Sequence, residues 1–147
     1  MKRIKLIRII IFTLLFSAGG LIILMNIYNP KAIKIENELK TEFNYITQLP
    51  EAVLIKVDSS HKTGQALVTG IFSTSLNYIK IRKYYDKELP RHGWKFIGEK
   101  VLTDWFRDFG GKMATYRKGN YKLTLTYAGE KANYGWDYSI DISWGLE

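Results

Sequence analysis

The first 30 residues constrain this chain more than any other part of it. Residues 9–30 run for 22 positions without a charged side chain, and residues 11–25 read IFTLLFSAGGLIILM. A helix of that length is about 33 Å long, compared with about 30 Å for the hydrocarbon core of a bilayer. Buried core helices of soluble domains are rarely so long or so uniformly apolar. The sequence therefore predicts a transmembrane helix over residues 9–29, with the lipid bilayer as its partner.

Charge next to this segment predicts its orientation. Residues 1–8 contain Lys2, Arg3, Lys5 and Arg8 and no acidic residue, which amounts to +4. Basic residues concentrate on the cytoplasmic side of membrane spans. We therefore expect a single-pass protein of the cell membrane, in which residues 1–8 are a cytoplasmic basic flank and residues 30–147 form an extracytoplasmic domain.

A cleaved signal peptide is the alternative interpretation of the same segment. Its apolar region would be about 7–15 residues long and would precede a small-residue cleavage site. Here the apolar run is longer, and the residues that follow it, Met25 to Asn29, contain no such site. The pattern favours an uncleaved signal anchor.

Composition excludes several classes of function. The formal net charge is +8, but residues 30–147 hold 18 basic and all 14 acidic residues, so only +4 belongs to the domain. A net charge of +4 does not indicate nucleic acid as a partner. With no cysteine, the chain has no disulfide, zinc ribbon or thiol nucleophile. No nucleotide-binding loop or metal-binding motif occurs, so we expect no cofactor and no metal.

Hydrophobic periodicity predicts an α+β domain. Apolar residues at helical spacing predict one helix from Ala32 to Leu49 and a second from the N-cap candidates 73–75 to Leu89. On the first helix, Glu36 and Lys40 form an i,i+4 pair expected on the side opposite the apolar stripe. Alternating or β-branched runs predict strands over residues 52–57, 65–72, 94–102, 112–118, 121–128 and 136–144.

The order of these elements, α-β-β-α-β-β-β-β, predicts two helices packed on an antiparallel sheet in a two-layer domain. Residues 58–64 are expected to form a polar turn. Gly119-Asn120 predicts a two-residue hairpin turn. In the last strand, apolar residues alternate with Asp137, Ser139, Asp141 and Ser143, which predicts a solvated outer face.

Catalytic signatures are missing from the sequence. His61 falls in the predicted 58–64 turn, and His92 follows a helix end, where it is expected to interact with exposed carbonyl groups. Asp137 and Asp141 would lie roughly 13 Å apart along a strand, too far for a glycosidase acid pair. Asp104 and Asp108 lie in a loop and are candidate acids for a hydrolase acting on envelope polymers.

The loop from Thr103 to Gly111 is the most unusual stretch of the domain. It contains Trp105, Phe106, Arg107, Asp108 and Phe109, followed by Gly110-Gly111. Aromatic residues together with Arg are typical of binding hot spots. Core packing of these rings and a Gly-Gly hairpin turn are the alternative interpretation. A second feature, the basic run Lys80-Ile81-Arg82-Lys83, is expected on a solvated helix face that could meet an anionic surface.

One segment carries a resemblance. Residues 84–94 read YYDKELPRHGW, and this Y-Y-x-x-E-L-x-x-x-G-W pattern resembles small secreted or membrane-anchored bacterial domains of uncharacterised function. The resemblance extends over residues 75–128, where a helix precedes the segment and a hairpin-rich half follows it. It implies a fold and no active site.

Together, these features favour a bacterial envelope protein with a non-catalytic extracytoplasmic domain that binds a protein or an envelope component. The envelope-polymer hydrolase that uses Asp104 or Asp108 is one alternative. A structural subunit of a secretion or pilus-like assembly is another.

Overall fold

The structure, a computed structural model, describes residue 20, residues 29–104 and residues 107–145. Within these residues, two helices accompany a six-stranded antiparallel sheet. The elements are α2 (Pro30–Tyr45), β1 (Val53–Lys62), β2 (Gln65–Ser73), α3 (Tyr78–Arg91), β3 (Lys95–Asp104), β4 (Arg107–Lys118), β5 (Tyr121–Tyr127) and β6 (Tyr138–Trp144). The predicted class and element order are confirmed for this region.

The predicted membrane span, residues 9–29, lies almost entirely outside the described residues, as do Lys2, Arg3, Lys5 and Arg8. In the part of the chain that is described, no helix is both long and apolar enough to cross a membrane. The membrane anchor therefore stays a prediction.

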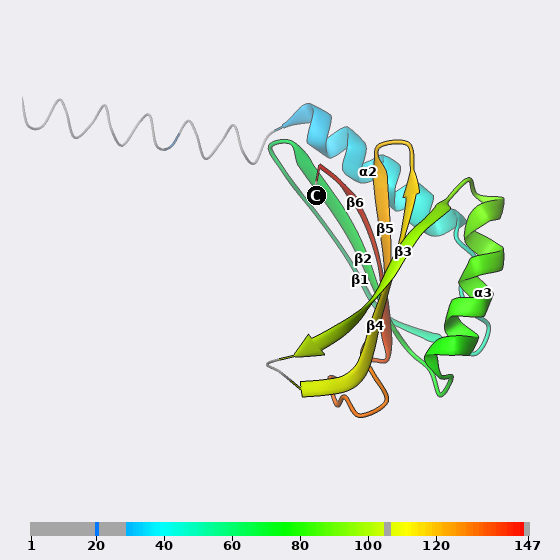
Figure 1. Cartoon of the computed structure of the whole chain (residues 1–147). Helices are drawn as coiled ribbons and strands as arrows, with labels where there is room; N and C mark the ends of the chain where they lie inside the picture. The colour runs from blue at the N-terminus through cyan, green and yellow to red at the C-terminus, as the bar shows by residue number, and fades with distance from the viewer. Residues whose placement is uncertain (1–19, 21–28, 105–106, 146–147) are drawn as a thin grey trace, which may run out of the picture.

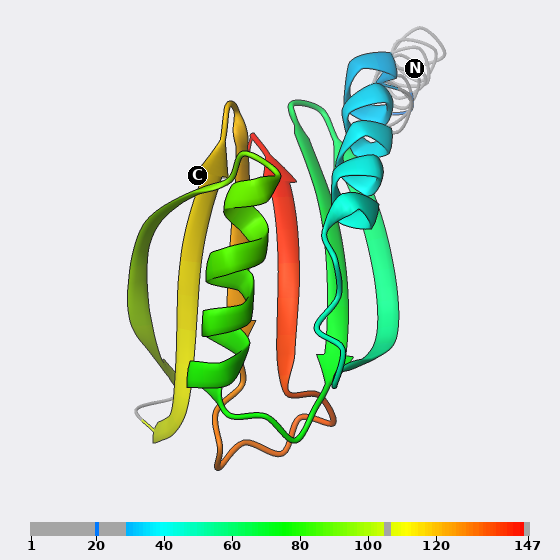
Figure 2. The ribbon, with the colours of Figure 1, turned by 90° about the vertical axis from the view of Figure 1, so that its right-hand side faces the viewer.

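Strand order places the last strand of the chain inside the sheet. The order is β1-β2-β6-β5-β4-β3, and every neighbouring pair is antiparallel. Both helices pack on the same face of the sheet (Figures 1 and 2). The opposite face, which we call the open face, has no helix on it in the described region. This arrangement is the predicted two-layer architecture.

The core lies between the helices and the sheet, and the predicted apolar stripe of each helix contributes side chains to it. Ala32, Ile35, Leu39 and Phe43 of α2 are buried, as are Tyr78, Ile81, Tyr85 and Leu89 of α3. In β2 and β6, alternate residues face these stripes. Ile79 of α3 is exposed, because it lies outside the face of the helix that meets the sheet.

Two helix boundaries differ from the sequence prediction. Helix α2 begins at Pro30, where the side chain of Asn29 accepts a hydrogen bond from the Ala32 N–H, and ends at Tyr45 rather than Leu49. Helix α3 is capped by Asn77, not by residues 73–75. The hydroxyl of Ser73 and the N–H of Thr74 instead bond to Asp137, which removes them from the capping role.

The predicted turn over residues 58–64 is mostly strand. Strand β1 continues to Lys62, and β2 begins at Gln65, so only Thr63 and Gly64 form the turn. Polar residues are accommodated in this strand because Ser59 and His61 point toward α2 and bond to Glu36. The expectation that Glu36 lies opposite the apolar stripe is wrong, since Glu36 is buried at the contact with β1.

The sheet has two distinct ends. At one end lie the β1–β2 turn, the β4–β5 turn, the end of β6 and the start of α2 (Figure 2). A shallow pocket confirms this proximity, because Lys31 of α2, Gly119 and Asn120 of the turn, and Trp144 of β6 line it together. At the other end lie the β3–β4 hairpin and the β5–β6 loop (Figure 1). We call these the entry end and the distal end.

Candidate binding site at the distal end

The hairpin that sequence analysis singled out forms part of the distal end. Asp104 and Arg107 are paired at the end of the β3–β4 ladder. Trp105 and Phe106 lie outside the described residues. Arg107 and Asp108 are exposed at the start of β4, and Phe109 is half-buried. The loop is therefore largely the tip of a hairpin, and β4 is longer than predicted by five residues, from Arg107 instead of Lys112.

Phe109 packs against residues of the β5–β6 loop, which sequence reasoning did not connect with it. Its ring lies edge-on to the ring of Tyr134, with centroids 6.3 Å apart. Tyr134 in turn stacks on Trp136, with centroids 5.8 Å apart. Tyr134 keeps 46% of its surface exposed. These three residues form what we call the aromatic cluster. Trp136 was expected on the core face of the last strand, but β6 begins only at Tyr138.

Backbone contacts hold the hairpin against the loop. The N–H of Lys131 donates to the carbonyl oxygen of Phe109 at 3.2 Å. Gly129 has a φ of 108° and lies so close to Phe109 that a side chain would collide with the backbone there. The pair Gly110-Gly111 does not turn the hairpin. Both glycines belong to β4, and Gly111 packs against the Ala128 carbonyl oxygen. The aromatic cluster is thus fixed by main-chain packing as well as ring contacts.

The carboxylate of Asp108 has a local structural role. It accepts a hydrogen bond of 2.8 Å from the N–H of Gly110, and in the described part of the chain it has no ion pair. A glycosidase needs a second acidic group about 5–9.5 Å away. Asp108 is exposed, and its hydrogen bond to the Gly110 N–H is a local backbone contact. The side chain of Asp104 lies outside the described residues.

Both histidines are paired with buried glutamates. The Nδ1 atom of His61 contacts Glu36, and the Nε2 atom of His92 lies 3.0 Å from Oε1 of Glu88. The side chain of His92 therefore bonds to a carboxylate within its own helix turn, not to exposed carbonyl groups as expected. Glu88 also accepts from the Thr47 N–H, so it joins α3 to the segment after α2. These contacts fasten helices to their neighbours.

Glu36 connects α2 to β1. Its carboxylate accepts from the Ser59 hydroxyl at 2.5 Å and lies 2.7 Å from Nζ of Lys40, besides its contact with His61. Hydrogen bonds from Lys40 and Ser59 lower the pKa of Glu36 from 4.5 to about 2, against the opposing effect of burial. A lowered pKa stabilises the folded state above about pH 4.5, and this contribution is lost as the pH falls toward 2.

We expect Glu36→Gln to lower the free energy of unfolding at pH 7 by about 2 kcal/mol, because charge-assisted hydrogen bonds are lost. The deficit should shrink as the pH falls from 5 to about 2, where the wild-type carboxylate itself becomes protonated. Urea unfolding of the full chain in detergent measures both values. Glu130→Gln, at an exposed acid in the β5–β6 loop, is the matched control. A deficit independent of pH would contradict the assigned role of the charge.

The acidic residues of the last segment are not on a solvated face, contrary to expectation. Asp141 accepts hydrogen bonds from the hydroxyls of Thr69 and Ser139, and burial raises its pKa. Its neighbours Ser139 and Ser143 are only 8% and 5% exposed. The cause is the central position of β6, because strands on both sides crowd its outer residues. Asp137 is bonded to Ser73 and Thr74.

Arg82 departs from the predicted solvated basic face. Its side chain is only 13% exposed, and its guanidinium lies over the rings of Phe96 and Tyr116, at 4.4 and 5.2 Å. Asp86 and Glu99 flank it. Lys80 and Lys83 remain exposed as expected. Arg82 thus acts as a bridge between α3 and strands β3 and β4 rather than as a contact for an anionic surface.

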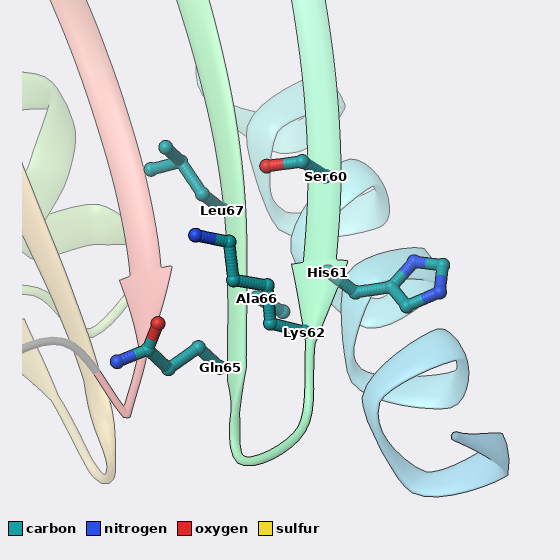
Figure 3. Close-up of a pocket in the computed structure, with 6 residues that line it drawn as sticks. All are labelled: Ser60, His61, Lys62, Gln65, Ala66 and Leu67. Carbon is teal, nitrogen blue, oxygen red and sulfur yellow. The ribbon is translucent and has the colours of Figure 1, made fainter. Parts of the chain in front are cut away.

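In the part of the chain that the structure describes, no group of three His, Asp or Glu residues is arranged to hold a metal ion. A small pocket of about 130 Å³ lies on the β1–β2 hairpin, where Ser60, Lys62, Gln65 and Leu67 surround it (Figure 3). Comparison with protein-family models, with curated proteins and with solved structures gives no match to this chain.

Proposed function

We propose that this chain is a single-pass membrane protein whose extracytoplasmic domain is a non-catalytic binding module. The aromatic cluster at the distal end carries the proposal. Tyr134 is exposed, whereas Phe109 and Trp136 are half-buried, and contacts between Phe109 and the β5–β6 loop hold the cluster in place. The exposed Arg107 lies two residues before Phe109 on β4. Exposed aromatic side chains next to Arg are the typical anchors of protein interfaces. The partner would be a protein or another component of the cell envelope.

The position of the cluster fits a membrane-attached binder. The chain enters the domain at Pro30, at the entry end, and the cluster lies at the opposite end of the sheet (Figures 1 and 2). A protein anchored by residues 9–29 would therefore present the cluster away from the bilayer.

Crosslinking in intact cells tests this proposal. A photoreactive amino acid in place of Tyr134 should capture a partner, whereas the same probe in place of Tyr45, an exposed residue of α2, should capture none. The simultaneous replacement of Trp105, Phe106 and Arg107 by Ala should lower the crosslinking yield at Tyr134 by roughly 30-fold, the loss expected when a hot spot is truncated. The single variant Phe109→Ala should lower it to the same extent.

The matched control is Ile79→Ala, which truncates an exposed apolar residue of α3 and should leave the yield unchanged. Circular dichroism of each purified variant must show an intact fold. Capture that is equal in wild type and in the triple variant would remove the distal end as the binding surface.

A further inference from the structure

The entry end carries an unusual arrangement of basic residues on the open face. Lys95 of β3 is paired with Arg117 of β4, and Arg117 is paired with Lys122 of β5. Adjacent strands are about 4.8 Å apart, so three cationic side chains stand side by side over about 10 Å. We call these three residues the basic row. Like charges directly opposite one another destabilise a sheet.

The basic row points away from the helices. Tyr116 and Lys118, on either side of Arg117, face the helix layer, where Tyr116 is buried and Lys118 bonds to Glu42. Tyr121 and Leu123, on either side of Lys122, do the same. Because successive strand residues alternate between faces, Arg117 and Lys122 lie on the open face. The pairing of Lys95 with Arg117 places Lys95 there too.

In the part of the chain that the structure describes, the acidic partners at this end lie on the helix face. Glu42 is 2.7 Å from Nζ of Lys118, and Glu38 accepts from the hydroxyl of Tyr121 at 2.6 Å. Among the described residues, none of the three side chains of the basic row makes an ion pair or a hydrogen bond; Lys122 accepts from Ser143 only through its backbone carbonyl oxygen. Among the residues that the structure describes, nothing therefore compensates the charge of this unfavourable row, and an external anion would relieve its repulsion.

The location of the basic row indicates which anion that is. Arg117 and Lys122 flank the Gly119-Asn120 turn, and this turn lies beside Lys31 in the first turn of α2. The residue before that helix is Asn29, where the proposed membrane segment ends. The same end carries Lys62, whose side chain runs across β2 on the open face (Figure 3). The cations thus gather where the proposed anchor brings the domain closest to lipid headgroups.

We propose that the basic row binds the anionic headgroups of the membrane in which the chain is anchored, and so holds the domain in one orientation on the bilayer. This inference rests on the proposed membrane attachment. Basic residues close to a bilayer are attracted by anionic lipids, and each one strengthens the contact about five-fold at ordinary ionic strength. The open face at the entry end then lies against the membrane, and the distal end with its aromatic cluster is held away from it.

Because the chain contains no cysteine, a single introduced cysteine can be labelled selectively. Ser60 is exposed on β1 and lies in the same cross-strand row as Lys122, through Leu67 and Ser143. A fluorophore on Ser60→Cys in the full chain, reconstituted into vesicles with a headgroup-labelled acceptor lipid, reports the distance of this face from the bilayer. Energy transfer should be higher in vesicles containing phosphatidylglycerol than in vesicles of phosphatidylcholine alone.

The triple variant Lys95→Gln, Arg117→Gln, Lys122→Gln should reduce transfer in phosphatidylglycerol vesicles to the phosphatidylcholine level. The control, Lys80→Gln, Lys83→Gln, Lys87→Gln, removes three charges from α3 and should transfer like wild type. Added salt should lower the wild-type signal, because screening shortens the reach of the lipid charge. Equal transfer in wild type and in the basic-row variant would overturn the inference. Loss of transfer on adding inorganic phosphate at constant ionic strength would also overturn it, in favour of a free-anion site.

Flotation of the same samples separates this inference from the proposed function. If every variant floats with the vesicles but energy transfer is the same in the wild type and in the basic-row variant, the proposed membrane attachment is supported and the proposed orientation by headgroups is wrong. If the wild-type chain does not float, the attachment itself fails, and the inference fails with it.

Discussion

The Tyr85→Ala variant is expected to unfold with a free energy about 4 kcal/mol lower than that of the wild type. Tyr85 is fully buried on α3 and packs against the rings of Tyr84 and Tyr138. Its removal leaves a cavity between the helix and the central strand β6. Urea unfolding of the full chain in detergent, followed by tryptophan fluorescence, measures the loss.

Tyr85→Phe separates ring packing from the hydrogen bonds of the hydroxyl. That hydroxyl lies 3.1 Å from the hydroxyl of Tyr138 and accepts from the N–H of Leu49 at 3.4 Å. Without it, two buried polar groups lose a partner, and we expect a cost of about 1–2 kcal/mol. A Phe variant as unstable as the Ala variant would show that the hydroxyl network, and not the ring, fastens α3 to the sheet.

The Gly129→Ala variant is expected to disrupt the distal end, at a cost of about 3 kcal/mol. A methyl group on Gly129 would lie 2.8 Å from the N atom of Gly111 and closer still to the Phe109 carbonyl oxygen. The φ of 108° is also one that side-chain-bearing residues rarely adopt. The β5–β6 loop must therefore move away from the hairpin, which separates Phe109 from Tyr134. Partner capture at Tyr134 should fall together with the melting temperature.

Gly64→Ala is the matched control for this variant. Gly64 has a φ of 78° in the β1–β2 turn, but a methyl group there meets open space. Only the backbone cost of about 1 kcal/mol should remain, and partner capture should persist. If both variants lose stability equally, the close approach of Gly129 to the hairpin has no energetic importance. If Gly129→Ala keeps full capture, the packing of the loop does not hold the binding surface.

Local pattern was sufficient for most of the fold. The apolar stripes of α2 and α3, the alternation of β5 and the Gly119-Asn120 turn are properties of neighbouring residues, and the structure has them where the sequence predicts them. The predicted bounds of helices and strands were wrong where a residue distant in the sequence supplied a hydrogen bond. Strand β1 runs through its polar residues because Glu36 satisfies Ser59 and His61, and α3 starts at Asn77 because Asp137 engages Ser73 and Thr74.

The candidate site could be predicted only in part. The hairpin residues 105–109 were singled out by composition, but Tyr134 and Trp136 were not, since they are 25 or more residues away in the chain. The sequence signal for this contact was Gly129, a glycine in the loop between β5 and β6. Glycines that allow two backbone segments to approach closely have no distinctive sequence pattern, so this one did not identify its partner. The charged side chains show the same limit. The sequence predicts Arg82 on the surface, but its guanidinium lies over the rings of Phe96 and Tyr116.

By itself, the sequence determined the class of the domain, the order of its elements and the faces that form its core, because periodicity is a local property of the chain. It also predicts the membrane anchor and its orientation from the uncharged run and the four basic residues before it. Only the tertiary structure decided that β6 lies inside the sheet, that Phe109 meets Tyr134, and that Lys95, Arg117 and Lys122 stand in one row near the start of α2. The physical reason is that strand order and register bring together residues far apart in the chain, and no local pattern encodes that choice.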